Sequence, residues 1–132
     1  MATITKFEDL EVWQLARALC KEIYSLTFSD PLKNDYRLKD QIRGSSGSVM
    51  DNIAEGFERS GKLEFINSLS YAKGETGELR SQLCRCFDIA YISEETFVAL
   101  YNKADVLARK ISAFISYLNT SKQKGQKFKN RE

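Results

Sequence analysis

The sequence contains no histidine among its 132 residues. This absence excludes Ser-His-Asp and Cys-His catalysis, HExxH zinc sites and the di-iron bundles that use histidine ligands. One proline and seven glycines supply few turns, which disfavours a sheet of many strands. The three cysteines are odd in number, so they predict reduced thiols in a cytoplasmic protein rather than a disulfide framework. No apolar run has the length of a signal-peptide core or a membrane span, so no membrane partner is expected.

The charge is unevenly distributed along a chain of ordinary globular composition. The formal net charge is +2, with 42% hydrophobic and 29% charged residues. Residues 122–132 hold five bases and one acid, a net of +4, so the other 121 residues carry a net of −2. The last segment also lacks apolar periodicity. We therefore predict one folded domain over residues 1–121 and a disordered basic tail over residues 122–132.

Apolar residues recur at alternating steps of four and three in most of the chain, and this spacing predicts helices with one apolar face. Helix starts are indicated by a capping box from Thr5 to Glu8, by Asp30 before a proline, and by Ser93 before two glutamates. Short connections between helices favour antiparallel neighbours. The sequence thus predicts an all-α, up-down-up-down antiparallel four-helix bundle, with helices at about 6–28, 32–58, 62–90 and 94–121.

The second of these segments has poor helix propensity, because each glycine costs about 1 kcal/mol relative to alanine. A hairpin that turns near Ser60 would place small residues opposite one another, for example Gly47 opposite Gly74, and would pair Arg43 with Glu78. Close helix packing explains the glycines better than a phosphate-binding loop, which would need a preceding strand and a lysine. Asn52 lies among the apolar positions of this segment. Its side-chain amide is expected to fix the register between helices rather than to bind a ligand. The residues assigned to packing and register are Gly44, Gly47, Asn52, Gly56, Gly74 and Gly77.

Several short runs match a known family: Phe7-Glu8-Asp9-Leu10-Glu11-Val12-Trp13-Gln14, Asn52-Ile53-Ala54-Glu55-Gly56, Arg59-Ser60 and Glu64-Phe65. On these runs the chain resembles the four-helix bundle proteins encoded by intervening sequences of bacterial 23S rRNA genes. It is also similar to the accessory variability protein of diversity-generating retroelements. The resemblance implies a homopentamer of four-helix protomers without catalytic activity, used as an interaction scaffold. The retroelement relative is a scaffold for a reverse transcriptase and its RNA.

Two groups of residues are candidates for contacts with partners. Four aromatic residues lie beside the apolar stripes and predict a subunit interface, with a ligand pocket as the alternative: Trp13, Tyr24, Tyr101 and Tyr117. Five tail bases are candidate contacts to RNA, with a solubilising tail as the alternative: Lys122, Lys124, Lys127, Lys129 and Arg131. If the tail is not the contact, the next candidates are Arg37, Lys39 and Arg43, the local basic cluster of the folded part.

Two acidic pairs support a rival hypothesis, a Mg²⁺-dependent all-α nucleotide pyrophosphohydrolase. Glu55 and Glu58, like Glu75 and Glu78, are spaced to share one face of a helix, and Mg²⁺ prefers carboxylate oxygens. The predicted hairpin separates the two pairs by about 13 Å along the helix axis, at about 1.5 Å per residue. One metal cluster cannot span that distance. We therefore expect no catalytic residue, metal, cofactor or small-molecule substrate.

Overall fold

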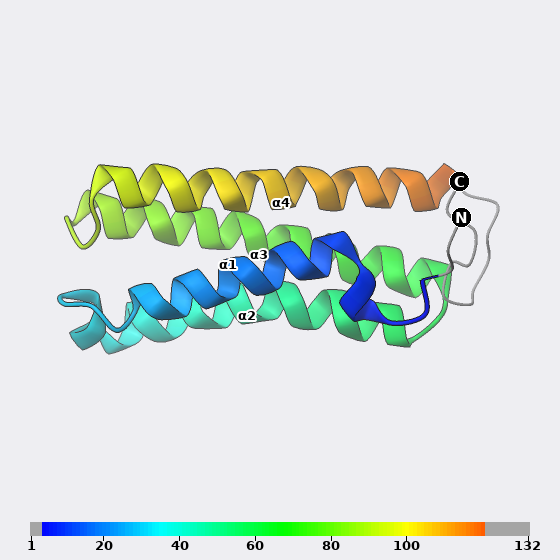
Figure 1. The fold of residues 1–132 in the computed structure, drawn as a ribbon, viewed down its shortest axis with the longest axis horizontal. Coiled ribbons are helices and arrows are strands. Elements are labelled where there is room, and N and C mark those ends of the chain that lie inside the picture. The colour runs from blue at the N-terminus through cyan, green and yellow to red at the C-terminus, as the bar shows by residue number, and fades with distance from the viewer. Residues whose placement is uncertain (1–3, 121–132) are drawn as a thin grey trace.

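The computed structural model describes residues 4–120 as four helices that run up, down, up and down (Figure 1). They are α1 (Glu11–Leu26), α2 (Tyr36–Glu58), α3 (Lys62–Asp88) and α4 (Glu94–Thr120), with short 3₁₀ helices η1 (Phe7–Asp9) and η2 (Leu32–Asn34). The prediction of an all-α antiparallel four-helix bundle is confirmed. The predicted basic tail, residues 122–132, lies outside the described residues.

One apolar core lies between the helices, and the predicted stripes supply it. On α3 the buried residues follow steps of four and three, as do those of α4. Three phenylalanine rings from different helices meet edge to face: Phe65 lies 5.7 Å from Phe57 and 5.4 Å from Phe114, between ring centroids. Among residues 4–120, no helix combines the length and the apolar character that crossing a membrane requires.

The starts of α1 and α2 differ from the prediction, because two leucines leave the helical path to enter the core. Leu10 is extended and buried between η1 and α1, so the predicted capping box at Thr5 does not form. Leu32 is buried within η2, and α2 begins only at Tyr36. The cap of α2 is Asp35, whose Oδ1 accepts a hydrogen bond of 3.1 Å from the backbone N–H of Leu38. The predicted cap, five residues earlier, precedes η2 instead.

The two later connections agree with the prediction. Ser60 takes a left-handed conformation with φ 67° between α2 and α3, at the predicted turn. Ser93 caps α4, since its Oγ accepts a hydrogen bond of 3.1 Å from the backbone N–H of Thr96. Between α3 and α4 the hydroxyl of Tyr91 donates to Oδ2 of Asp35 at 2.9 Å. This bond ties the α3–α4 connection to the start of α2 at one end of the bundle.

The predicted glycine packing is wrong at most positions. Gly44, Gly47 and Gly74 have no atom of a neighbouring element within 4 Å of the place where a Cβ would stand. They face outward because residues two positions away along the helix are the ones buried in the core, as Val49 is for Gly47. A Cβ on Gly77 would make only an ordinary contact with Arg80.

Gly56 is the glycine at which two helices approach closely. A Cβ there would overlap the Cβ of Ser68 on α3, and would come within 2.7 Å of the Oγ of the same residue. Gly56 is itself buried. Small side chains elsewhere in α2 also enter the core, since Ser45 and Ser46 are buried. Gly56 therefore marks the close approach of α2 and α3, while the two serines add small buried side chains to α2.

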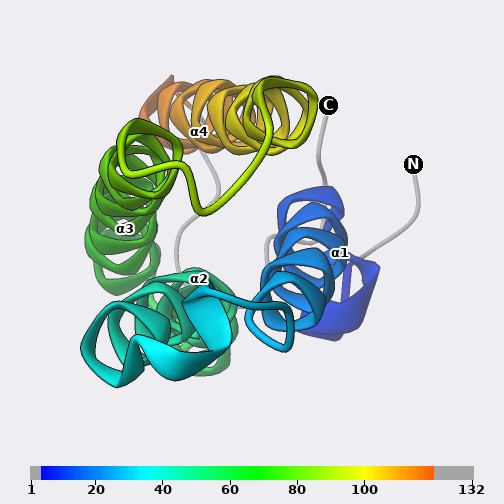
Figure 2. The ribbon, with the colours of Figure 1, turned by 90° about the vertical axis from the view of Figure 1, so that its left-hand side faces the viewer.

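α1 is the least firmly embedded helix. α2 packs extensively on α3, and α3 packs extensively on α4. By contrast, α1 packs mainly on α2 and much less on α4. The end-on view shows α1 standing beside α2 with a wider separation from α4 (Figure 2). Of the four contacts between neighbouring helices, the one between α1 and α4 is thus the loosest.

Cys86 is expected to resist alkylation in the folded protein. It is buried in the core, and burial raises the pKa of its thiol to about 11. Because the thiolate is the reactive form, iodoacetamide at pH 8 should modify Cys86 roughly tenfold or more slowly than the half-buried Cys20. Mass spectrometry after timed labelling measures both rates, and labelling in denaturant is the control. Equal rates in the native protein would contradict the buried position.

Candidate functional site

Exposed aromatic rings and basic side chains gather where α1 is connected to α2. We call this surface the aromatic–basic patch; it consists of Tyr24, Phe28, Tyr36, Lys39 and Arg43. Phe28 and Tyr36 are 66% and 68% exposed, which is unusual for rings of this size. They flank η2, whose leucine fills the core, so the connection turns its other side chains toward solvent. The patch is a product of the unpredicted turn at η2.

Arg43 is held in a defined position within the patch. Its guanidinium lies over the ring of Tyr24, 4.7 Å from the centroid, and over that of Phe28, at 5.0 Å. Its Nε donates a hydrogen bond of 2.8 Å to Oγ1 of the buried Thr27. Arg43 therefore contacts α1 and the residues that follow it. The predicted ion pair with Glu78 on α3 is wrong.

Lys39 completes the basic side of the patch. Its Nζ lies 4.8 Å from the ring centroid of Tyr36, one helical turn away. The carboxylate of Asp35, which precedes α2, is already engaged by a backbone N–H and by Tyr91. The hydrogen bond to Asp35 raises the pKa of the Tyr91 hydroxyl. Neutral donors thus occupy both carboxylate oxygens of Asp35, which forms no ion pair with Lys39 or Arg43.

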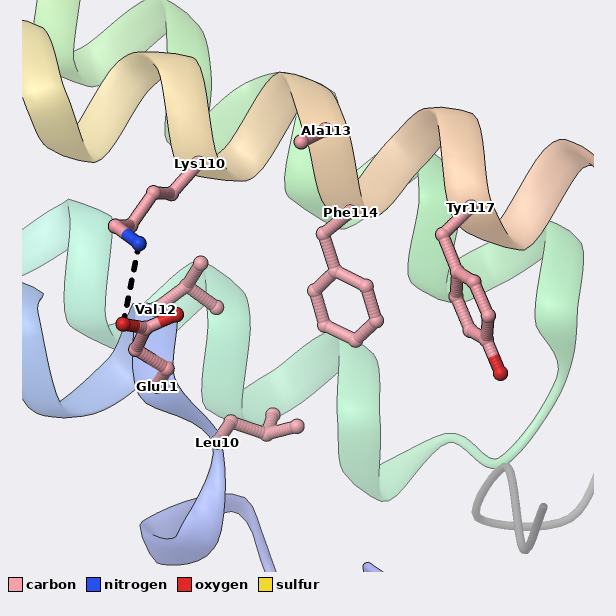
Figure 3. Close-up of a pocket in the computed structure, with 7 residues that line it drawn as sticks. All are labelled: Leu10, Glu11, Val12, Lys110, Ala113, Phe114 and Tyr117. Carbon is pink, nitrogen blue, oxygen red and sulfur yellow. Dashed lines mark ion pairs between the residues drawn. The ribbon is translucent and has the colours of Figure 1, made fainter. Parts of the chain in front are cut away.

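The second surface feature is a groove between α1 and α4, which we call the α1–α4 groove. One hollow of about 310 Å³ lies near the start of α1 (Figure 3). In the close-up, Phe114 projects from α4 toward Leu10, and Tyr117 projects from the same side of α4. Two further hollows continue along the same pair of helices. The middle one has a largely apolar lining that includes Leu15, Ala18, Leu19 and Val106.

Two ion pairs span the α1–α4 groove, and both place the acid on α1 and the base on α4. Lys103 Nζ lies 2.8 Å from Glu22, and Lys110 Nζ lies 3.2 Å from Glu11. All four side chains are substantially exposed, so each pair contributes about 0–1 kcal/mol to stability. The two pairs therefore determine which charges line the groove, but they add little to the stability of the contact between α1 and α4.

The four aromatic residues predicted at a subunit interface do not share one face. Trp13 packs on Phe7, with ring centroids 5.1 Å apart, and Tyr24 belongs to the aromatic–basic patch. Tyr101 lies beside Arg80 at the boundary of α3 and α4. Only Tyr117 lines the α1–α4 groove. Each ring thus has a partner within the chain.

Asn52 lies within a polar hollow on α2 and α3 that also includes Glu55, Arg59 and Tyr71. Its Nδ2 donates to the backbone carbonyl of Ser48 at 2.9 Å. This hydrogen bond runs within α2, not between helices. The predicted register role is therefore not visible in its bonding.

The acidic pairs of the rival hypothesis do not assemble. Glu55 forms a 3.2 Å ion pair with Arg59. Glu75 hydrogen-bonds Glu78, and its pKa is raised by burial first and by that contact second. Within residues 4–120 no three cysteine, aspartate or glutamate side chains lie close enough to hold a metal ion. The enzyme hypothesis lacks its carboxylate cluster in this part of the chain.

Sequence reasoning identified the cations of the folded part but missed the exposed rings. Arg37, Lys39 and Arg43 were named as a cluster, and two of them belong to the patch. Phe28 and Tyr36 fall outside the apolar stripes; Phe28 lies in the turn before Asp30, and Tyr36 begins α2 directly after Asp35. That position was the available signal. The five predicted tail contacts lie outside the described residues.

Comparisons with known proteins place the chain in a family. The family model described as 23S rRNA-intervening sequence protein matches residues 8–113. The fold is similar to a crystal structure, at 1.70 Å, of a protein of unknown function from the S23 ribosomal protein family of Bacteroides thetaiotaomicron VPI-5482. The TM-score is 0.73 at 21% identity over 79% of this chain and 97% of that one, which shows a shared fold. No curated protein matches significantly. Because the model covers most of the chain, the protein belongs to the 23S rRNA-intervening sequence protein family.

Proposed function

We propose that the protein is a non-catalytic interaction scaffold that assembles as a homo-oligomer, with five copies as the family resemblance implies, and that binds RNA. Membership of the family supports the architecture. The three free thiols fit a cytoplasmic protein. The partners are other copies of the chain and an RNA or an RNA-associated protein.

The α1–α4 groove is the observation that carries the assembly proposal. Its apolar lining remains partly uncovered in one chain, since Val106 is 47% exposed. Acids line the α1 side, including Glu11 and Glu22, and bases line the α4 side, including Lys103 and Lys110. These charges are paired within one chain, so in an assembly the α4 bases of one copy would exchange their partners for the α1 acids of the next. Such a head-to-tail contact is heterologous, and it forms a ring when the rotation closes.

Light scattering is expected to give a mass about five times 15.1 kDa for the parent protein. The Val106→Glu variant should give a smaller mass, because it places a charge on the uncovered apolar surface of the groove. Leu63→Glu is the matched control, since Leu63 is exposed on α3, outside the groove. A parent that is monomeric at micromolar concentration would remove the assembly proposal. A Val106→Glu variant that keeps the parent mass would move the interface elsewhere.

The basic tail provides the sequence-independent part of the proposed RNA binding. Its five bases are Lys122, Lys124, Lys127, Lys129 and Arg131. Each phosphate that they neutralise contributes about −0.7 to the slope of log affinity against log salt on a single strand. Several tails on one assembly would raise the local concentration of cations. The affinity from the tail alone should therefore fall steeply with salt.

A further inference from the structure

We propose that the aromatic–basic patch is a binding site for single-stranded RNA, in which bases stack on the exposed rings while phosphates lie on the cations. The inference rests on the proposed RNA-binding scaffold and names the surface of the folded part that contacts the bases.

The rings are arranged to receive flat partners. Phe28 and Tyr36 stand at the two ends of one short connection and expose about two-thirds of their surface. Tyr24 is 40% exposed beside them. Unpaired bases stack on aromatic side chains with little sequence preference, because every base has a π-face. Tyr24 and Phe28 both contact Arg43 and Tyr36 begins α2, so the rings offer separate stacking surfaces for the unpaired bases of one strand.

The cations are positioned by the same rings. Arg43 is fixed by the rings of Tyr24 and Phe28 and by its bond to Thr27 through Nε. In the described part of the chain its Nη atoms have no hydrogen-bond partner, so they remain available to phosphate oxygens. Little side-chain entropy is lost when a guanidinium that is already ordered binds an anion.

The charge balance of the patch favours a polyanion. From Tyr36 to Arg43 the helix carries three bases and one acid, Asp40. The neighbouring Asp35 is engaged by Leu38 and Tyr91. A single strand fits this surface better than a duplex, because the bases of a duplex are already stacked on one another and cannot reach the rings.

Fluorescence anisotropy with a labelled single-stranded RNA of mixed sequence tests the proposal over a series of salt concentrations. The double variant Phe28→Ala, Tyr36→Ala should lower the affinity about tenfold for each stacked base that is lost, with an unchanged salt slope. Arg43→Gln should instead flatten the slope by about 0.7. Tyr36→Phe, which keeps the ring, should bind like the parent. Tyr71→Ala is the matched control, because Tyr71 is 70% exposed on α3, outside the patch.

A full-length variant with the five tail bases changed to glutamine separates the two surfaces. If it loses all binding while the double ring variant binds like the parent, the patch proposal is overturned and the proposed scaffold keeps its RNA contact on the tail. If the parent binds no RNA at any salt concentration, both the RNA function and the patch proposal fail, whereas the assembly is still decided by light scattering. If the double ring variant loses as much affinity for duplex RNA as for single-stranded RNA, the proposed stacking of unpaired bases on the rings is overturned.

Discussion

Replacing Phe65 with alanine is expected to lower the free energy of unfolding by about 3–5 kcal/mol. The Phe65 ring is fully buried and makes edge-to-face contacts with Phe57 on α2 and Phe114 on α4. Its loss would therefore leave a cavity where three helices meet, and would remove two aromatic contacts of about 0.5–1.5 kcal/mol each. Chemical denaturation at one fixed protein concentration measures the change, since the proposed assembly would make stability depend on concentration.

Tyr71→Ala on the same helix is the control for the Phe65 variant. Tyr71 is 70% exposed, so its removal should change stability by no more than about 0.5 kcal/mol. A Phe65→Ala variant that unfolds at the same denaturant concentration as Tyr71→Ala would contradict the three-helix contact. A loss of helical signal in Phe65→Ala without denaturant would be the strongest form of the expected result.

Enlarging Gly56 is expected to have the second large effect. A leucine at Gly56 should destabilise the protein by about 3 kcal/mol or more, because the new side chain would overlap Ser68. The overlap is with a Cβ atom, which no side-chain rotation can move, so α2 and α3 would have to separate. Alanine at Gly56 should cost about 1–2 kcal/mol, even though it gains about 1 kcal/mol of helix propensity.

Gly47 provides the opposite result on the same helix. No neighbour lies within 4 Å of the position of its Cβ, so Gly47→Ala should raise stability by up to about 1 kcal/mol through helix propensity. Thermal unfolding of the two alanine variants compares them directly. If Gly56→Ala melts at or above the parent temperature, α2 and α3 are not in close contact at this point.

The helices could be predicted because their signals are local. The step of four and three from Phe65 through Leu83 identifies α3 without knowledge of its neighbours, since a helix buries one stripe whichever partner covers it. The cap at Ser93 acts within one turn, so the sequence also located the start of α4. Both signals need only residues a few positions apart.

The errors concern choices that depend on the rest of the molecule. Leu10 and Leu32 interrupt helical paths because the core offers each of them a place, which no short window of sequence reveals. Helix propensity marks every glycine alike, whereas among the three glycines of α2 it is Gly56 whose added Cβ would overlap a neighbouring helix. Which glycine does so depends on the rotation of α2 against α3.

The candidate site was predicted only in part, for a similar reason. Basic residues can be counted in the sequence, so Lys39 and Arg43 were found. Their usefulness depends on the rings next to them, and Arg43 reaches Tyr24 across the boundary between two helices. Periodicity indicates which residues are buried, but it does not distinguish an exposed ring in a turn from one that folds inward.

The loose contact of α1 with α4 sets an order of local stability within the bundle. α3 is held by a helix on each side, whereas α1 is held mainly by α2 and by two exposed ion pairs. Local opening requires less free energy where fewer buried contacts are lost. We therefore expect the backbone amides of α1 to exchange with solvent before those of α3. The helix that opens most easily is also the one that carries Tyr24 and the acidic side of the groove.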